Sequence, residues 1–293
     1  MGQDEIRTEK HNRGLSVWGA VLLFVAGFLL FTALYTTIAF ELLPWIVGKE
    51  VQNDGLIPYI MIEGSMLLAV LTPAVILLRL ERRPFSDLGL GLKGHSIGLL
   101  YGTLCAVLLY AIGFGWSLLA GSVEIRGIHF DWQALGASWF FYLLVSLTEE
   151  CLVRGFILGH LLRTRLNKFL SLLLTSLLFG ALHLTNPNIA FLPMLNLVLA
   201  GILLGSSFLY TRNLCFPIAL HLFWNWIQGP ILGYEVSGNK FTTSMLSLHL
   251  PEEDLINGGA FGFEGSLVCT VLLLIFIPLI IWWGEKREAI ANV

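Results

Sequence analysis

The stretch WFFYLLVSLTEECLVRGFILGHLL, residues 139–162, decides the fold. Its two ends are apolar and aromatic, as in a membrane helix, yet its centre carries Glu149, Glu150 and Arg154. An ionised side chain in the middle of a span costs about 2.5–3.5 kcal/mol on insertion scales, so such residues usually face a protein interior or a wet cavity. The stretch therefore predicts a membrane helix with a polar face and marks its charged residues as functional candidates.

The composition of the whole chain is that of a membrane protein. Of its 293 residues, 56% are hydrophobic and only 13% are charged, and the mean hydropathy is +0.78. The net charge of -3, with the cations in short stretches between apolar runs, argues against a nucleic-acid partner. The four cysteines lie inside apolar runs without a CxxC pair, which predicts packing residues rather than disulfides or zinc thiolates.

Apolar runs long enough to cross a bilayer recur along the chain. They predict an all-α, polytopic helical bundle that forms a single integral membrane domain over residues 1–293. The first run lacks a cleavage pattern and is expected to remain as a membrane helix. About eight spans are expected, at residues 15–40, 57–80, 96–120, 137–162, 169–184, 189–210, 214–234 and 264–284.

The loop charges support this number of spans. Cytoplasmic loops of membrane proteins hold an excess of Lys and Arg. With eight spans, only Lys49, Arg126 and Lys240 fall on one side. The other side receives all the remaining loop cations, namely Arg7, Lys10, Arg13, Arg79, Arg82, Arg83, Lys93, Arg163, Arg165, Lys168, Arg212, Lys286 and Arg287. We therefore expect a multi-pass protein, in the cell membrane, with both termini cytoplasmic.

Helical spacing separates the two central carboxylates. At about 100° per residue, Arg154 lies about 40° around the helix from Glu150 but about 140° from Glu149. Glu150 and Arg154 are therefore predicted to form a buried structural pair. Glu149 is left on another face, where a desolvated carboxylate without a local counter-ion suits a general base. The alternative is that all three charges only bridge helices.

Two further motifs place polar side chains on other spans. FGALH puts Phe179 and His183 four residues apart on one helix face, and HLFWN does the same for His221 and Asn225. A lone membrane histidine is often only an interhelical hydrogen-bonding residue. A carboxylate, two imidazoles and an amide that meet in one cavity would, however, form a hydrolytic set.

Other polar residues are assigned no catalytic role. Glu63, near the start of the second span, is predicted to reach the outer interface as a helix-end carboxylate rather than to line a substrate entrance. His160 is expected at the interface that follows the fourth span. The glycine-rich NGGAFGFEGS, residues 257–266, is expected to be a structural cap before the last helix.

Together the three motifs resemble those of the CPBP family of intramembrane proteases, which includes type II CAAX prenyl endopeptidases and bacteriocin-processing or immunity proteins. The family pattern EExxxR, FxxxH and HxxxN is matched throughout a motif-bearing core at residues 140–230. The matching residues are Glu149, Glu150 and Arg154, then Phe179 and His183, then His221 and Asn225.

The resemblance implies a role for each motif residue. Glu149 is expected to be the catalytic carboxylate that activates water with help from His183. His221 and Asn225 are expected to stabilise the oxyanion. Glu150 and Arg154 are supporting residues, and Phe179 packs beside the site.

Metal use is open, because the family has been described both as metalloproteases and as glutamate-dependent proteases. We expect water activation without a metal cofactor. The alternative is zinc held by Glu149 or Glu150 with His183 and His221, but no HExxH helix is present.

The function predicted is therefore an intramembrane endopeptidase acting on a membrane-associated or prenylated peptide or protein. Its expected partners are that substrate and the lipid bilayer. One alternative is a transporter in which the same residues form an ion or proton relay. The other is a non-catalytic immunity or scaffold protein that binds a peptide in the same cavity.

Overall fold

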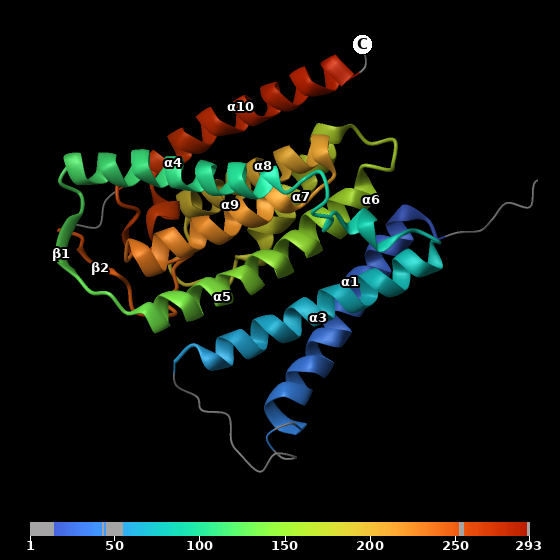
Figure 1. Cartoon of the computed structure of the whole chain (residues 1–293), viewed down its shortest axis with the longest axis horizontal. Helices are drawn as coiled ribbons and strands as arrows, with labels where there is room; N and C mark the ends of the chain where they lie inside the picture. Colours follow the sequence, from blue (N-terminus) through green and yellow to red (C-terminus); the bar gives the residue numbers. More distant parts are fainter. Residues whose placement is uncertain (1–14, 43, 45–54, 252–254, 292–293) are drawn as a thin grey trace, which may run out of the picture.

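The computed structural model describes residues 15–42, 44, 55–251 and 255–291 (Figure 1). Arg7, Lys10, Arg13 and Lys49, on which the sorting of loop charges partly depends, lie outside the described residues. The orientation of the termini therefore stays a prediction.

Helices occupy all eight predicted spans within the part of the chain that the structure describes, which confirms the all-α bundle. They are α1 (Val17–Thr37), α3 (Ile57–Leu80), α4 (Ile97–Leu119), α5 (Trp132–Glu150), which continues through Cys151–Leu158 into α6 (Gly159–Leu161), α7 (Lys168–Leu182), α8 (Phe191–Thr211), α9 (Cys215–Trp226) and α10 (Leu267–Ala291).

Five of these helices are by themselves long and apolar enough to cross a membrane: α1 with its continuation, α3, α4, α8 and α10. α7 is shorter, with 15 residues. α5 and α9 carry the polar motifs, and each continues as a π-helix, at Cys151–Leu158 and Ile227–Ile231 respectively. π-Helical turns are rare and often occur at functional sites.

Side-chain caps define where the motif helices begin. Asp131 Oδ1 accepts hydrogen bonds from the backbone N–H groups of Gln133 and Ala134, both at 3.0 Å, at the start of α5. Asn167 Oδ1 accepts one from Phe169 N–H at 2.8 Å at the start of α7. These bonds satisfy donors that have no partner within the helix.

α9 is the central helix of the bundle. It packs against α4, α5 and α8, while α3 packs between α1 and α5, and α10 packs against α8 (Figure 1). At Gly102 of α4, a Cβ atom would lie only 2.4 Å from the Phe216 carbonyl oxygen of α9, so the close approach requires glycine. Large apolar side chains such as Leu22, Leu104 and Leu274 are exposed on the outer helices, as contact with lipid requires.

A small two-stranded sheet joins the loops at one end of the bundle. β1 (Glu124–Ile128) pairs antiparallel with β2 (Leu246–His249), and Glu124 lies opposite His249 in the register. This pairing ties the α4–α5 connection to the long segment between α9 and α10 (Figure 1). That segment also reaches the polar interior described below.

The opposite, cationic end holds an ion cluster around His160. This side chain is buried within the protein, its Nδ1–H donates to the Phe156 carbonyl at 2.8 Å, and its Nε2 lies 3.2 Å from Glu81 Oε2. Its depth relative to the membrane interface stays a prediction. Arg163 and Arg83 reach the same oxygen at 3.0 and 3.3 Å. Burial acts to raise the pKa of the Glu81 carboxyl, but His160 and the two arginines outweigh it and hold this pKa below its ordinary value.

The four cysteines, Cys105, Cys151, Cys215 and Cys269, are all free thiols within helices, as predicted.

Candidate active site

The predicted pair at the end of α5 is confirmed. Arg154 Nη1 donates to Glu150 Oε1 at 2.8 Å, and both side chains are buried, with exposures of 1% and 0%. Arg154 Nη2 donates to the Gly201 carbonyl of α8 at 3.1 Å. The guanidinium also lies 4.4 Å from the centre of the Phe179 ring, so Phe179 packs beside the site as predicted. The cation therefore joins α5, α7 and α8.

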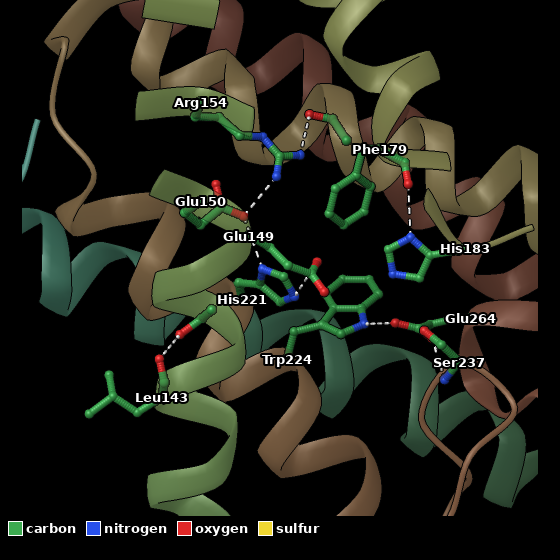
Figure 2. A network of polar contacts seen from close by, with 12 residues as sticks. Leu143, Glu149, Glu150, Arg154, Phe179, His183, His221, Trp224, Ser237 and Glu264 are labelled. Carbon is green, nitrogen blue, oxygen red and sulfur yellow. Dashed lines mark hydrogen bonds and ion pairs between the residues drawn. The ribbon is translucent and has the colours of Figure 1, made fainter. Parts of the chain in front are cut away.

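Glu150 has a second partner that helical spacing could not indicate. His221 Nδ1 lies 2.9 Å from the same Oε1 atom (Figure 2). A carboxylate paired with arginine only accepts hydrogen bonds, so His221 Nδ1 carries the proton. The bond fixes the ring orientation and leaves Nε2 as the atom that faces the cavity.

Glu149 lies beyond His221, on another face of α5, as predicted. Its Oε2 is 3.9 Å from His221 Nε2, which is too long for a hydrogen bond. This oxygen is buried and has no hydrogen-bond partner among the described residues. The Glu149 side chain is 23% exposed and lines a cavity. Glu150 Oε2 likewise has no partner among the described residues, but of the two carboxylates it is Glu149 that lines the cavity, where a ligand or water could reach it.

His183 is held in a similar way at the end of α7. Its Nδ1–H donates to the Phe179 carbonyl, four residues earlier, at 2.8 Å. A carbonyl only accepts, so Nδ1 carries the proton and Nε2 keeps a lone pair when the ring is neutral. The side chain lines the same cavity and lies across from Glu149 in Figure 2.

Asn225 completes the predicted set. It lies one turn after His221 on α9, is 94% buried and lines the cavity. No hydrogen bond joins its side-chain amide to another described residue. The amide N–H groups are therefore available to a group inside the cavity.

The segment before α10 contributes a residue that the motifs did not indicate. Glu264 Oε1 accepts from Trp224 Nε1 at 2.8 Å, and its Oε2 accepts from Ser237 N–H and Oγ–H at 2.9 and 2.6 Å (Figure 2). Asn196 of α8 donates to the Glu264 carbonyl at 2.7 Å. The glycine-rich cap is thus hydrogen-bonded to α8 and α9, and its Glu264 forms part of the cavity wall. The signal in the sequence that could have indicated this role is that Glu264 is the single charged residue of the glycine-rich stretch at residues 257–266.

The cavity has a volume of about 330 Å³ and gathers residues from six helices and the segment before α10. Glu149, His183, His221 and Asn225 all line it, so the predicted polar set does meet in one place. Much of the remaining wall is apolar, from Phe28, Met66, Leu152, Leu182, Leu197, Leu203, Leu204 and Leu220.

Glu63 also lines this cavity, which corrects its prediction as an interfacial carboxylate. Tyr59, Ile62, Glu63 and Met66 share the face of α3 that is turned toward α5, so the carboxylate is directed inward. Spacing within α3 could not show this, because it depends on how α3 packs against α5.

Whether the protein uses a metal stays a prediction. Within residues 15–42, 44, 55–251 and 255–291, no group of three or more His, Cys, Asp and Glu side chains lies close enough together to hold a metal ion. In particular, Glu149, His183 and His221 do not form one such group.

Residues 131–227 match the family model described as type II CAAX prenyl endopeptidase Rce1-like. The matched region contains all three motifs and overlaps the predicted core at residues 140–230. No curated protein and no solved structure matches the chain. The match covers about a third of the chain. It supports the resemblance of the motif-bearing core to CPBP-family intramembrane proteases and favours an endopeptidase of the CAAX type over a transporter.

Proposed function

We propose that this membrane-embedded CAAX-type protease cleaves a peptide bond of a prenylated or otherwise membrane-associated peptide, with water activated by Glu149. The observation that carries the proposal is the position of Glu149, whose side chain lines the cavity shared with His183, His221 and Asn225 and whose Oε2 has no hydrogen-bond partner among the described residues.

Glu149 would act first as a general base. Its carboxylate takes one proton from a water molecule while the water oxygen forms a bond to the carbonyl carbon of the substrate. His183 Nε2 accepts a hydrogen bond from the other O–H of the same water and so orients it. The bond from His183 Nδ1 to the Phe179 carbonyl supports this role, because it leaves Nε2 as the acceptor.

The negative charge then forms on the substrate oxygen and requires donors. Asn225 offers amide N–H groups that are free of other partners among the described residues. His221, as an imidazolium, donates from Nε2 to the oxyanion and from Nδ1 to Glu150. In a site of low dielectric constant such donors stabilise the developing charge strongly.

Collapse of the tetrahedral intermediate completes the reaction. The carbonyl re-forms, the C–N bond breaks, and Glu149 returns the proton to the leaving nitrogen as a general acid. Glu150 and Arg154 touch no reacting atom in this scheme. They are positioning residues that hold His221 in place.

The cavity wall supports an apolar substrate group. Phe28, Met66, Leu152 and Leu203 come from four different helices and offer a hydrophobic surface beside the polar set. A prenyl chain or an apolar transmembrane segment could lie against this wall while the scissile bond reaches Glu149.

The test is peptide cleavage by the full chain and by Glu149→Gln in detergent. The probes are a farnesylated CAAX peptide and its unprenylated counterpart. We expect kcat to fall by about 10²–10⁴-fold in Glu149→Gln, because the amide cannot take the proton. The matched control is Glu124→Gln, since this carboxylate is exposed on β1 and should leave cleavage unchanged.

Thermal melting checks that both variants remain folded. Equal cleavage by wild type and a folded Glu149→Gln would contradict the proposed role of Glu149. Faster cleavage of the farnesylated peptide would assign the apolar wall to the prenyl group. Peptide binding without any cleavage by the wild type would favour the non-catalytic alternative.

A further inference from the structure

The cavity holds more carboxyl groups than hydrolysis requires. Glu63, Glu149 and Glu264 line it, whereas no Lys or Arg of the described residues does. Arg154 lies behind the wall and is already paired with Glu150. The partners of Glu264 are the neutral groups of Trp224 and Ser237. Even with His221 as the imidazolium that the proposed mechanism uses, carboxyl groups outnumber cationic side chains among the described residues that line the cavity.

Glu63, like Glu264, is a carboxyl group of the cavity that the proposed mechanism does not use. It is half-buried on α3, a helix outside the region matched by the family model. No hydrogen bond or ion pair joins its carboxylate to another residue in the described part of the chain. It lies close enough to Glu149 and His221 to interact with both electrostatically. A cationic ligand bound beside it supplies the counter-ion with which this carboxyl group can ionise in a partly apolar cavity.

An aromatic wall lies beside Glu63. Tyr59 is one turn earlier on the same face of α3, and its ring centre lies 5.1 Å from that of Phe241 and 6.4 Å from that of Phe141. Phe241 is also 5.1 Å from Phe141 and 6.4 Å from Tyr142. All four rings line the cavity. Aromatic faces next to a carboxylate are the surroundings in which proteins bind organic cations.

We propose that the Glu63 end of the cavity is a subsite for a Lys or Arg side chain of the peptide substrate. The cation pairs with the Glu63 carboxylate and packs against Tyr59, Phe141, Tyr142 and Phe241. Glu63 is then a specificity-determining residue, distinct from the base Glu149. This inference rests on the proposed function for the identity of the ligand as a peptide substrate.

The test measures binding rather than cleavage, in the Glu149→Gln background that prevents turnover. The probes are farnesylated peptides in which one residue is Lys or its uncharged analogue norleucine, moved in turn along the peptide. Intrinsic tryptophan fluorescence, to which Trp224 in the cavity wall contributes, reports binding. At one position we expect Lys to bind about tenfold more tightly than norleucine, as a charged hydrogen bond provides.

Three variants decide whether Glu63 is responsible. Adding Glu63→Gln should remove the preference for Lys, and adding Glu63→Lys should replace it with a preference for Glu at the same position. Adding the control Glu124→Gln should leave the preference unchanged. A preference for Lys that survives Glu63→Gln, or equal binding of Lys and norleucine at every position, would overturn the subsite.

The same peptides separate this proposal from the proposed function. A wild type that prefers Lys through Glu63 but cleaves neither peptide would refute the protease activity and keep the subsite. A wild type that cleaves and binds both peptides equally would refute only the subsite. If none of the peptides bound, both the subsite and the proposal that its ligand is a peptide substrate would be overturned.

Discussion

Two clusters built from the same side chains lie in different parts of this bundle. In the candidate active site, Glu150 Oε1 is bound by Arg154 at 2.8 Å and by His221 at 2.9 Å. At the cationic end, Glu81 Oε2 is bound by Arg163, His160 and Arg83 at 3.0, 3.2 and 3.3 Å. A carboxylate, a histidine and an arginine therefore do not by themselves identify a site.

The two clusters differ in the second ring nitrogen of the histidine. His221 Nδ1 is held by Glu150, and its Nε2 faces a cavity that also contains Glu149 and Asn225. His160 instead uses Nδ1 for the Phe156 carbonyl and Nε2 for Glu81, so both of its nitrogens are engaged. A catalytic histidine requires a ring nitrogen that is held in position but has no hydrogen-bond partner. Of the two histidines compared, His221 meets this requirement.

The two arginines differ in burial, so the largest expected difference between the clusters is in how far loss of the arginine destabilises the fold. Arg154→Met leaves Glu150 buried without its cation, so we expect a loss of about 3–5 kcal/mol in the free energy of unfolding. Arg163→Met removes a cation whose side chain is 40% exposed, and we expect a loss of at most about 1 kcal/mol. Denaturation of both variants in the same detergent measures the two losses.

The double variant Glu150→Leu/Arg154→Met serves as the control. It removes both charges together and should recover part of the stability lost in Arg154→Met. Equal destabilisation by Arg154→Met and Arg163→Met would show that depth in the bundle does not distinguish the two clusters.

Replacing each carboxylate by the corresponding amide should affect peptide cleavage in one cluster and not in the other. Glu150→Gln keeps the shape but removes the charge that holds the His221 imidazolium, so we expect kcat to fall by about 10²-fold with KM nearly unchanged. Glu81→Gln should alter kcat by no more than about twofold, because neither Glu81 nor His160 lines the cavity that holds Glu149. Cleavage kinetics at a temperature where both variants are folded measure this difference.

The pattern of kcat and KM distinguishes positioning from general damage. A folded Glu150→Gln with normal kcat would contradict the role of Glu150 as the residue that orients His221. A fall in kcat for Glu81→Gln as large as that for Glu150→Gln would show that the cationic end is coupled to the active site.

The features that depend on one helix were predictable from the sequence. Four-residue spacing indicated the Glu150–Arg154 pair and placed His221 with Asn225 on one stripe, and both arrangements are confirmed. The apolar runs located the helices because bilayer thickness sets their length. The motif region was indicated by charges that are costly in a bilayer unless they face a protein interior.

The features that join distant segments were not predictable in this way. The bond between His221 and Glu150 spans 71 residues, and that between Trp224 and Glu264 spans 40. The inward position of Glu63 depends on how α3 packs against α5, not on the position of this residue within α3. The π-helix after Glu150 is a local departure from the α-helical spacing that the angular argument assumed.

The smallest expected effect concerns the pH dependence of the Glu81 cluster. Because His160 and the arginines hold the pKa of Glu81 below its ordinary value, the ionised form stabilises the fold. This stabilisation is fully present above the pKa of an unfolded Glu, about 4.3, and is lost as the pH falls through the lower folded value. Because solvent screens this cluster, we expect the ionised carboxylate to contribute at most about 1 kcal/mol to the free energy of unfolding.

Melting of wild type and Glu81→Gln should therefore differ at pH 7 and converge as the pH falls below about 4. Repeating the pair in a His160→Gln background separates the carboxyl from the imidazole, and a gap that instead widens toward low pH would contradict the assigned sign.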